Sequence, residues 1–203
     1  MLDWNIEESL YSEGYTTICG CDEAGRGPLA GDVVAAACIL PKGLIIDGLN
    51  DSKKISAKKR EALFDVITEK ALAYSICSCS VEEIEKYNIL ESALLAMRKA
   101  VATLDITPDY ILVDGNISRG FDIKAKAVIG GDGKSPNIAA ASILAKVTRD
   151  RLCLEYDKMY PEYGFAKHKG YATKDHVEAI KKYGPCPLHR SLFLRKILGQ
   201  NEE

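Results

Sequence analysis

The chain has 203 residues, of which 47% are hydrophobic and 28% charged, and its formal net charge is −2. This length suits one domain of ordinary size, and the composition excludes disordered and collagen-like chains. No apolar run reaches the length of a membrane span, and the N-terminal segment carries acids where a signal peptide needs a basic start. We therefore expect a cytoplasmic protein that does not bind membranes.

Charge is unevenly distributed along the chain. Residues 119–196 hold 16 Lys and Arg against 8 Asp and Glu, whereas residues 1–104 hold 11 against 16. A basic half beside an acidic half fits a polyanion held near a cation, although a solvated charged surface is the more common cause of such a bias. The 7 cysteines include no C-x-x-C pair, which indicates buried thiols in a reducing compartment and no zinc or redox motif.

The predicted elements begin with three strands. Small and β-branched apolar residues predict strands over 15–21, 33–40 and 71–79, and a glycine turn joins the first two as an antiparallel pair. Ser56 is a capping residue for a helix over 57–70. Ser80 and Glu83 have the form of a capping box that starts a short helix, and an apolar stripe predicts a longer helix over 90–104.

In the second half of the chain, strands alternate with helices. We predict strands over 110–113 and 124–129 and helices over 137–156, 174–183 and 191–198. The order of these elements predicts an α/β fold, a mixed β-sheet flanked by helices on both faces. We place the main domain over residues 1–160, with residues 161–203 as a small helical C-terminal extension packed on it.

Acidic residues stand where the predicted strands end. Asp22 and Glu23 follow the first strand, Asp114 follows the fourth, and Asp132 comes after the fifth. Carboxylates that converge repel one another unless a cation lies among them, and oxygen ligands suit Mg²⁺ and Mn²⁺. The alternative is that these acids are ordinary turn residues. Since side chains alternate along a strand, Asp22 and Glu23 can share a site only if the strand twists, bulges or ends at Asp22.

A glycine-rich turn follows the acidic pair. Gly25 and Gly27 leave the backbone open to a ligand, and Arg26 between them is a donor suited to phosphate. His168 lies in a basic cluster, and Tyr171 could stack on a sugar or base, although either residue is more often structural. The nucleotide-binding glycine motifs are absent from the sequence, and the 3 histidines lack metal-binding spacing.

Six blocks of the sequence resemble, in order, the bacterial ribonucleases HII. The blocks are Ile18–Gly31, Asn50–Lys54, Val113–Gly115, Gly131–Asp132, Ala140–Asp150 and His168–Thr173. The resemblance covers nearly the whole chain and implies a ribonuclease H-like fold. It also implies a metal-dependent endonuclease that hydrolyses the RNA strand of RNA/DNA hybrids and cuts at single ribonucleotides in duplex DNA. Such an enzyme leaves 5′-phosphate and 3′-hydroxyl ends and serves ribonucleotide excision repair and primer removal.

The resemblance also assigns roles to residues. Asp22, Glu23, Asp114 and Asp132 correspond to catalytic acids that hold two divalent ions, Mn²⁺ or Mg²⁺. The residues expected to bind the substrate are Gly25, Arg26, Gly27, Lys53, Ser142, Lys146, His168, Lys169 and Tyr171. Among them, the glycine turn and Tyr171 correspond to the residues that sense an RNA-to-DNA junction.

One departure from the family pattern is Asp32, where proline or a small residue is usual; an added acid there could change metal affinity. We expect a monomer. A replication clamp stays open as a partner of the C-terminal tail, although nothing in the sequence supports that contact. Two other readings stay open. A DNA-specific nuclease of the same fold would use the same acids, and a non-catalytic nucleic-acid-binding domain would need none of them.

Overall fold

A five-stranded mixed sheet forms the centre of the protein. The computed structural model describes residues 2–195 and 197–199. The strands are β1 (Ile18–Ala24), β2 (Val33–Ile39), β3 (Ala73–Cys79), β4 (Tyr110–Asp114) and β5 (Ala125–Val128). Their order is β3-β2-β1-β4-β5, with β1, β2 and β3 antiparallel and with β4 and β5 parallel to β1. The predicted mixed sheet is confirmed.

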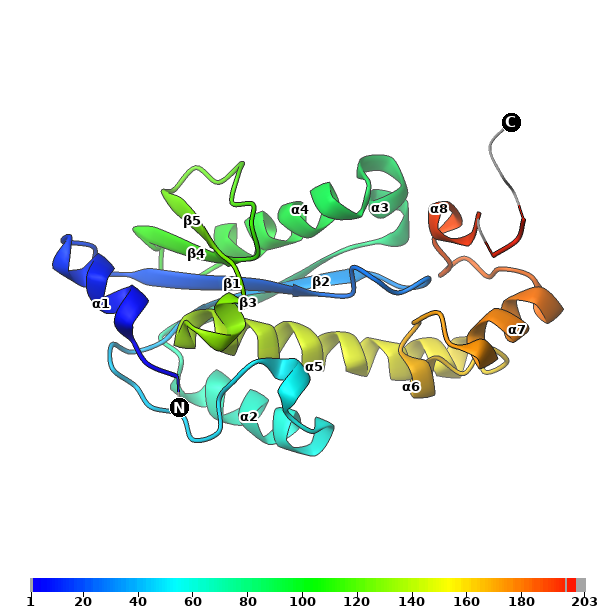
Figure 1. Cartoon of the computed structure of the whole chain (residues 1–203), viewed down its shortest axis with the longest axis horizontal. Helices are drawn as coiled ribbons and strands as arrows, with labels where there is room; N and C mark the ends of the chain where they lie inside the picture. The colour runs from blue at the N-terminus through cyan, green and yellow to red at the C-terminus, as the bar shows by residue number, and fades with distance from the viewer. Residues whose placement is uncertain (1, 196, 200–203) are drawn as a thin grey trace.

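Helices cover both faces of the sheet, as predicted (Figure 1). On one face lie α2 (Ala57–Lys70) and α5 (Pro136–Met159), and on the other α3 (Val81–Tyr87) and α4 (Ile89–Ala102). Along β2, Ala36 and Cys38 pack toward α5, and their neighbours Ala35 and Ala37 pack toward α4. Because both faces are buried, this strand is a continuous apolar run in the sequence.

The contact between α5 and β1 is unusually close. A Cβ atom on Gly20 would lie 2.2 Å from the carbonyl carbon of Asn137 and 2.3 Å from the nitrogen of Ile138. The next residues of α5, Ala139 to Ala141, are fully buried and small. The lack of side-chain bulk on both elements lets the two backbones touch.

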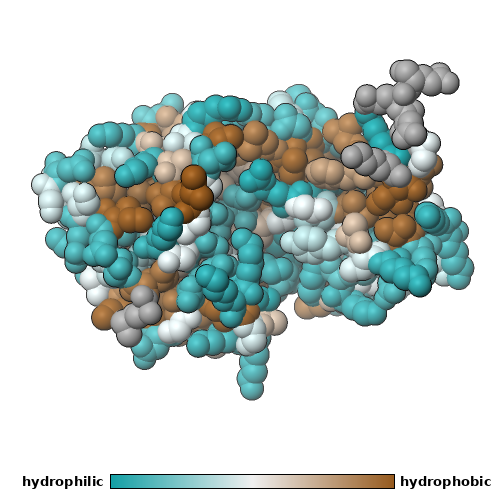
Figure 2. All heavy atoms as spheres, in the orientation of Figure 1, coloured by the Kyte–Doolittle hydropathy of each residue, from teal (hydrophilic) through white to brown (hydrophobic). Residues whose placement is uncertain are grey.

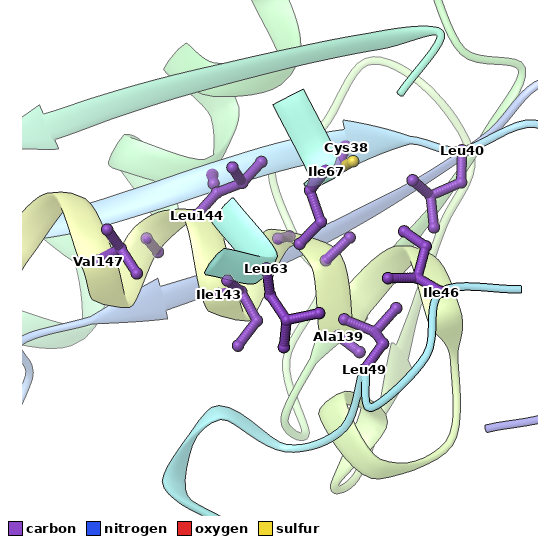
Figure 3. Packing of buried hydrophobic residues seen from close by; sticks show 14 of the residues in the cluster. Cys38, Leu40, Ile46, Leu49, Leu63, Ile67, Ala139, Ile143, Leu144 and Val147 are labelled. Carbon is purple, nitrogen blue, oxygen red and sulfur yellow. The ribbon is translucent and has the colours of Figure 1, made fainter. Parts of the chain in front are cut away.

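The outer side of α5 is covered by α2. In Figure 3, Leu63 and Ile67 of α2 point into a buried cluster that also contains Ile143 and Leu144 of α5.

Figure 2 shows a face on which hydrophilic side chains predominate and hydrophobic ones form separate patches. None of the helices in the described part of the chain combines the length and apolarity needed to cross a membrane.

Strand β1 differs from its predicted bounds. It starts at Ile18 because the amides of Thr16 and Thr17 donate to the carboxylate of Asp109, at 2.7 and 3.0 Å, and not to a neighbouring strand. It continues to Ala24 because β2 still pairs with it there. The sequence pattern could not show either partner.

The N-terminal helix α1 (Asn5–Ser12) was not predicted, because its short sequence has few apolar residues. The fully buried Glu7 anchors it to the start of α5. One carboxylate oxygen of Glu7 accepts from the Ser135 hydroxyl at 2.5 Å and from the Asn137 amide at 3.1 Å. Burial raises the pKa of this carboxyl.

The remaining helices gather at one end of the molecule, opposite α1 (Figure 1). They are α6 (Phe165–His168), α7 (Lys174–Tyr183) and α8 (Ser191–Leu194). Their apolar residues pack against Leu29, Ala30 and Tyr156 in a common cluster. The last helix was predicted over 191–198, but α8 ends at Leu194. Residues 196 and 200–203 of the tail lie outside the described residues.

The contact at Gly20 makes a stability prediction. Gly20→Ala should lower the free energy of unfolding by about 3 kcal/mol, the upper end of the usual cost of overpacking, because the atoms in the way belong to the α5 backbone and cannot rotate aside. Urea denaturation followed by circular dichroism measures the change. Gly133→Ala is the matched control, since a Cβ atom there meets nothing within 4 Å. Equal losses in the two variants would contradict this account of the contact.

Candidate active site

The predicted acids meet at a notch in the sheet beside β1. Pairing of β1 with β4 stops at Cys21 and Val113, whereas pairing with β2 continues without an extra residue to Ala24. Beyond Cys21, β1 therefore has no paired strand on its β4 side. Asp22 and Glu23, which leave opposite faces of the strand, line the same pocket there. The strand does not end or bulge at Asp22; the missing neighbour brings the two carboxylates to one site.

Asp22 is the buried centre of this acidic group, with only 5% of its surface exposed. Burial raises its pKa well above the ordinary value, and the charges of Glu23 and Asp114 raise it further. The Ser142 hydroxyl and the backbone amide of Glu23 oppose this shift, and that amide donates to Asp22 Oδ1 at 2.7 Å. Ionisation of Asp22 is therefore disfavoured unless a cation offsets the effects of burial and of the neighbouring acids.

Asp114 is the common neighbour of the other acids. Its Oδ1 accepts from the backbone amide of Gly131 at 2.7 Å, which fixes the carboxylate at the end of β4. Its charge adds to the effect of burial in raising the pKa of Glu23 and of Asp132, and it acts on Asp22 as well. Arg26 opposes the shift at Glu23, with its Nη1 at 3.2 Å from Glu23 Oε1.

The donor atoms of this group suit a hard divalent cation. Within residues 2–195 and 197–199, no group of three acidic, histidine or cysteine side chains is already arranged to hold a metal. The four acids instead form interacting pairs around Asp114. All their ligand atoms are carboxylate oxygens, and a bound cation would relieve the repulsion that raises the pKa of Asp22 and Asp132. Asp22, Glu23, Asp114 and Asp132 are thus the residues that would hold it.

Lys53 and Asp51 border the acidic group from the short helix η1 (Ser52–Lys54). Lys53 Nζ lies 3.8 Å from Asp132 Oδ2. Partial burial opposes ionisation of Lys53, but the charges of Asp132 and Asp22 outweigh it and raise its pKa. Asp51, which was not among the predicted site residues, acts on Asp132 as a further neighbouring acid. The sequence did offer a sign of this role, because Asp51 lies close to Lys53 in the block Asn50–Lys54 that resembles the ribonucleases HII.

Most predicted binding residues line one pocket of about 600 Å³ together with Asp22 and Glu23. They are Gly25, Arg26, Gly27, Lys53, Ser142, Lys146 and Tyr171. Lys169 lies elsewhere and borders a neighbouring pocket beside Arg60 and Asp150. Asp32 does not line the pocket of the acids, so the added acid in this chain is set apart from them.

The predicted phosphate contact by His168 is wrong. The residue is buried, its Nε2 donates to the Tyr163 carbonyl at 2.7 Å, and its Nδ1 accepts from the Gly170 amide at 3.2 Å. Neither ring nitrogen is left for a ligand. His176 and His189 lie close by with their Nε2 atoms 3.1 Å apart, and burial lowers the pKa of each to about 4. His176 and His189 are therefore neutral at pH 7. All three histidines are buried structural residues around the loop that ends in Tyr171.

Comparison of folds gives the class of this protein. Ribonuclease H2 from Pyrococcus horikoshii OT3 superimposes with a TM-score of 0.75 at 28% identity, covering 91% of this chain and 98% of that one. Bst-RNase HIII in complex with Mn²⁺ gives a TM-score of 0.71 at 16% identity, covering 92% and 70%. The fold is that of the ribonuclease H-like nucleases.

Comparison of sequences narrows the class to one family. The profile of the family "Ribonuclease HII" matches residues 19–196. The ribonuclease HII of Clostridioides difficile (strain 630) is 54% identical over 193 residues, which are 95% of this chain and 76% of that protein. The chain belongs to the ribonuclease HII family and is a ribonuclease H enzyme.

The acidic group predicts stabilisation by a metal ion. Mg²⁺ or Mn²⁺ at 100 times its dissociation constant should raise the free energy of unfolding of the wild type by about 2.7 kcal/mol. Asp22→Asn should lose most of this gain, yet without metal it should be at least as stable as the wild type, because one buried charge is gone. Thermal and urea unfolding with and without metal test both statements.

The control for this measurement is Asp65→Asn, which changes an exposed acid on α2 and should keep the full metal effect. A metal effect of equal size in Asp22→Asn would contradict the assignment of the site.

Proposed function

We propose that this enzyme hydrolyses the RNA strand of RNA/DNA hybrids and also cuts at single ribonucleotides in duplex DNA. The observation that supports this most is the shared pocket, in which Asp22 and Glu23 face the turn Gly25–Gly27 and Tyr171. A site for phosphodiester hydrolysis and a site for the sugar are thereby adjacent. The products would be 5′-phosphate and 3′-hydroxyl ends, and the cellular roles ribonucleotide excision repair and primer removal.

Asp22, Glu23, Asp114 and Asp132 are the residues we assign to two divalent ions, Mn²⁺ or Mg²⁺. When bound, such ions activate a water molecule and stabilise the leaving 3′ oxygen in an in-line displacement. The support for metal is the all-oxygen donor set with its mutual repulsion, together with the Mn²⁺ complex of the structural neighbour Bst-RNase HIII. Lys53 lies close enough to the acids to neutralise part of their charge while the site is vacant or the substrate approaches.

The sugar-facing side of the pocket consists of the glycine turn and Tyr171. A Cβ atom on Gly27 would lie 3.6 Å from Tyr171 Cε1, and 45% of the tyrosine surface is exposed. The 2′-hydroxyl distinguishes RNA from DNA and is displayed in the shallow minor groove, where main-chain groups can reach it. In our proposal the turn contacts this hydroxyl and Tyr171 packs on the neighbouring deoxyribose. Arg26 and Lys146 supply positive charge for phosphates.

A set of cleavage reactions tests this function. With Mg²⁺ or Mn²⁺, the wild type should cut an RNA/DNA hybrid and a duplex with one ribonucleotide, but not an all-DNA duplex, and end mapping should show 5′-phosphates. Losing a residue that supports a metal ligand already costs about 10 to 100-fold, so losing the ligand in Asp22→Asn should cost more.

Hybrid binding by Asp22→Asn, measured by fluorescence anisotropy, should stay near that of the wild type, because the basic residues are unchanged. Cutting of all-DNA duplex would favour a DNA-specific nuclease. Binding without cleavage of any duplex would favour a non-catalytic domain.

Tyr171→Ala tests the junction role. Removing a stacking ring costs about 1–3 kcal/mol, so cleavage at a single ribonucleotide should fall by about 5- to 150-fold. Continuous hybrid offers many cleavage positions and should be affected less. Single-turnover rates on the two substrates give the ratio, and Tyr74→Ala, at a 40% exposed tyrosine of the edge strand β3, is the control. An equal loss on both substrates would argue against the role.

A further inference from the structure

Two buried arginines lie directly beneath the glycine turn. Arg190 and Arg149 are 0% and 1% exposed, although arginine is seldom fully buried without a partner. Neither guanidinium forms a salt bridge within the described residues, and both donate chiefly to main-chain carbonyls. Arg190 comes from the segment just before α8, and Arg149 from the middle of α5.

Arg190 donates hydrogen bonds to the main-chain carbonyls of the turn and of the residues that follow it. The acceptors and distances are Gly25 O at 2.7 Å, Arg26 O at 3.2 Å, Pro28 O at 2.9 Å, and Gly31 O at 2.6 and 2.9 Å. Its own backbone amide donates to Leu29 O at 2.8 Å. One side chain thus determines the orientation of most peptide groups in the turn.

Arg149 joins the turn to the loop that holds Tyr171. It donates to Ala30 O at 3.1 Å and Asp32 O at 3.2 Å on one side, and to Lys169 O at 3.0 Å on the other. The amide of Leu29 adds a direct bond to Gly170 O at 2.8 Å. The two parts that we assign to the sugar are therefore fixed to each other.

The amides of the turn point the other way. In a trans peptide unit the N–H of one residue points opposite to the C=O of the residue before it. Because Arg190 draws in the carbonyls of Gly25 and Arg26, the N–H groups of Arg26 and Gly27 face away from it. Both residues are exposed, and neither amide has an acceptor in the part of the chain that the structure describes.

We infer that Arg190 is a positioning residue for sugar recognition. By holding the carbonyls of Gly25 and Arg26 it directs the amides of Arg26 and Gly27 into the pocket, where they donate to a substrate oxygen. That oxygen is the ribose 2′-hydroxyl, which DNA lacks. The inference rests on the proposed function and adds a residue from the C-terminal extension to the site.

Arg190→Lys is the direct test. Lysine keeps the positive charge but offers one ammonium group in place of a planar fork, so it cannot hold four carbonyls. Cleavage at a single ribonucleotide should fall about 10-fold more than cleavage of continuous hybrid, whereas stabilisation by Mn²⁺ should match the wild type because the acids are intact. Arg151→Lys, at an exposed arginine paired with Glu61, should change neither value.

An unchanged substrate ratio in a folded Arg190→Lys variant would overturn the inference. A wild type that cleaves no ribose-containing duplex would instead overturn the proposed function, so the two failures are distinct. Circular dichroism and urea denaturation establish whether the variant is folded.

A second measurement does not need the Arg190 variant. The amide resonances of Arg26 and Gly27 are followed by NMR in Asp22→Asn, which should not cleave, during titration with two duplexes. Shifts with the single-ribonucleotide duplex alone identify the 2′-hydroxyl as the acceptor, whereas equal shifts with the all-DNA duplex would identify a phosphate oxygen and overturn the role in sugar recognition. Shifts with neither duplex would overturn the inference.

Discussion

The backbone contact between α5 and β1 at Gly20 determines where the parts of the site lie. Gly20 touches the helix at Asn137 and Ile138. From there, about 1.5 Å per helical residue brings Ser142 about 6 Å along, and about 3.3 Å per strand residue brings Asp22 about 7 Å along. By the same estimate Arg149 and Gly25 both lie about 16 Å along. The observed contacts agree, since Ser142 acts on Asp22 and a Cβ atom on Gly25 would meet Arg149.

Opposite charges lie on the two sides of the glycine turn. On one side of the turn, the carboxylates of the acidic group repel one another. On its other side, the guanidiniums of Arg149 and Arg190 are buried, and burial costs several kcal/mol per ion unless hydrogen bonds compensate. Burial lowers the pKa of Arg190 to about 9, so it is still protonated at neutral pH. The turn carbonyls supply those hydrogen bonds. Burial raises the pKa of Asp32, and the nearby positive charges of Arg190 and Arg149 act against this rise. The acid that departs from the family pattern thus lies next to the arginines and not in the pocket.

Local sequence patterns predicted much of the fold and of the acidic group, because they depend on neighbouring residues. The capping box at Ser80 and Glu83 is present, and the order of elements correctly predicted the mixed sheet. The notch beside Asp22 could not be predicted, because it depends on where β4 stops relative to β1. His168 was misassigned since its basic neighbours in sequence suggested a surface site, whereas the fold buries it. Arg149 and Arg190 were overlooked for the same reason, because an arginine in a basic segment is usually exposed, whereas the fold buries both.

Because these arginines are buried, the basic residues in the second half of the chain do not all serve to attract a polyanion. Its positive charge is divided between exposed lysines, such as Lys146 at the pocket, and guanidiniums that never meet solvent. Only the exposed group can contribute to salt-dependent attraction of a polyanion. The buried group orients the main chain, and Arg190 and Tyr171 both come from beyond residue 160, where we placed the domain boundary. In our proposal the site therefore contains residues from both sides of that boundary. The acids around β1 and β4 perform the hydrolysis, and the C-terminal extension holds the turn that distinguishes one sugar from the other.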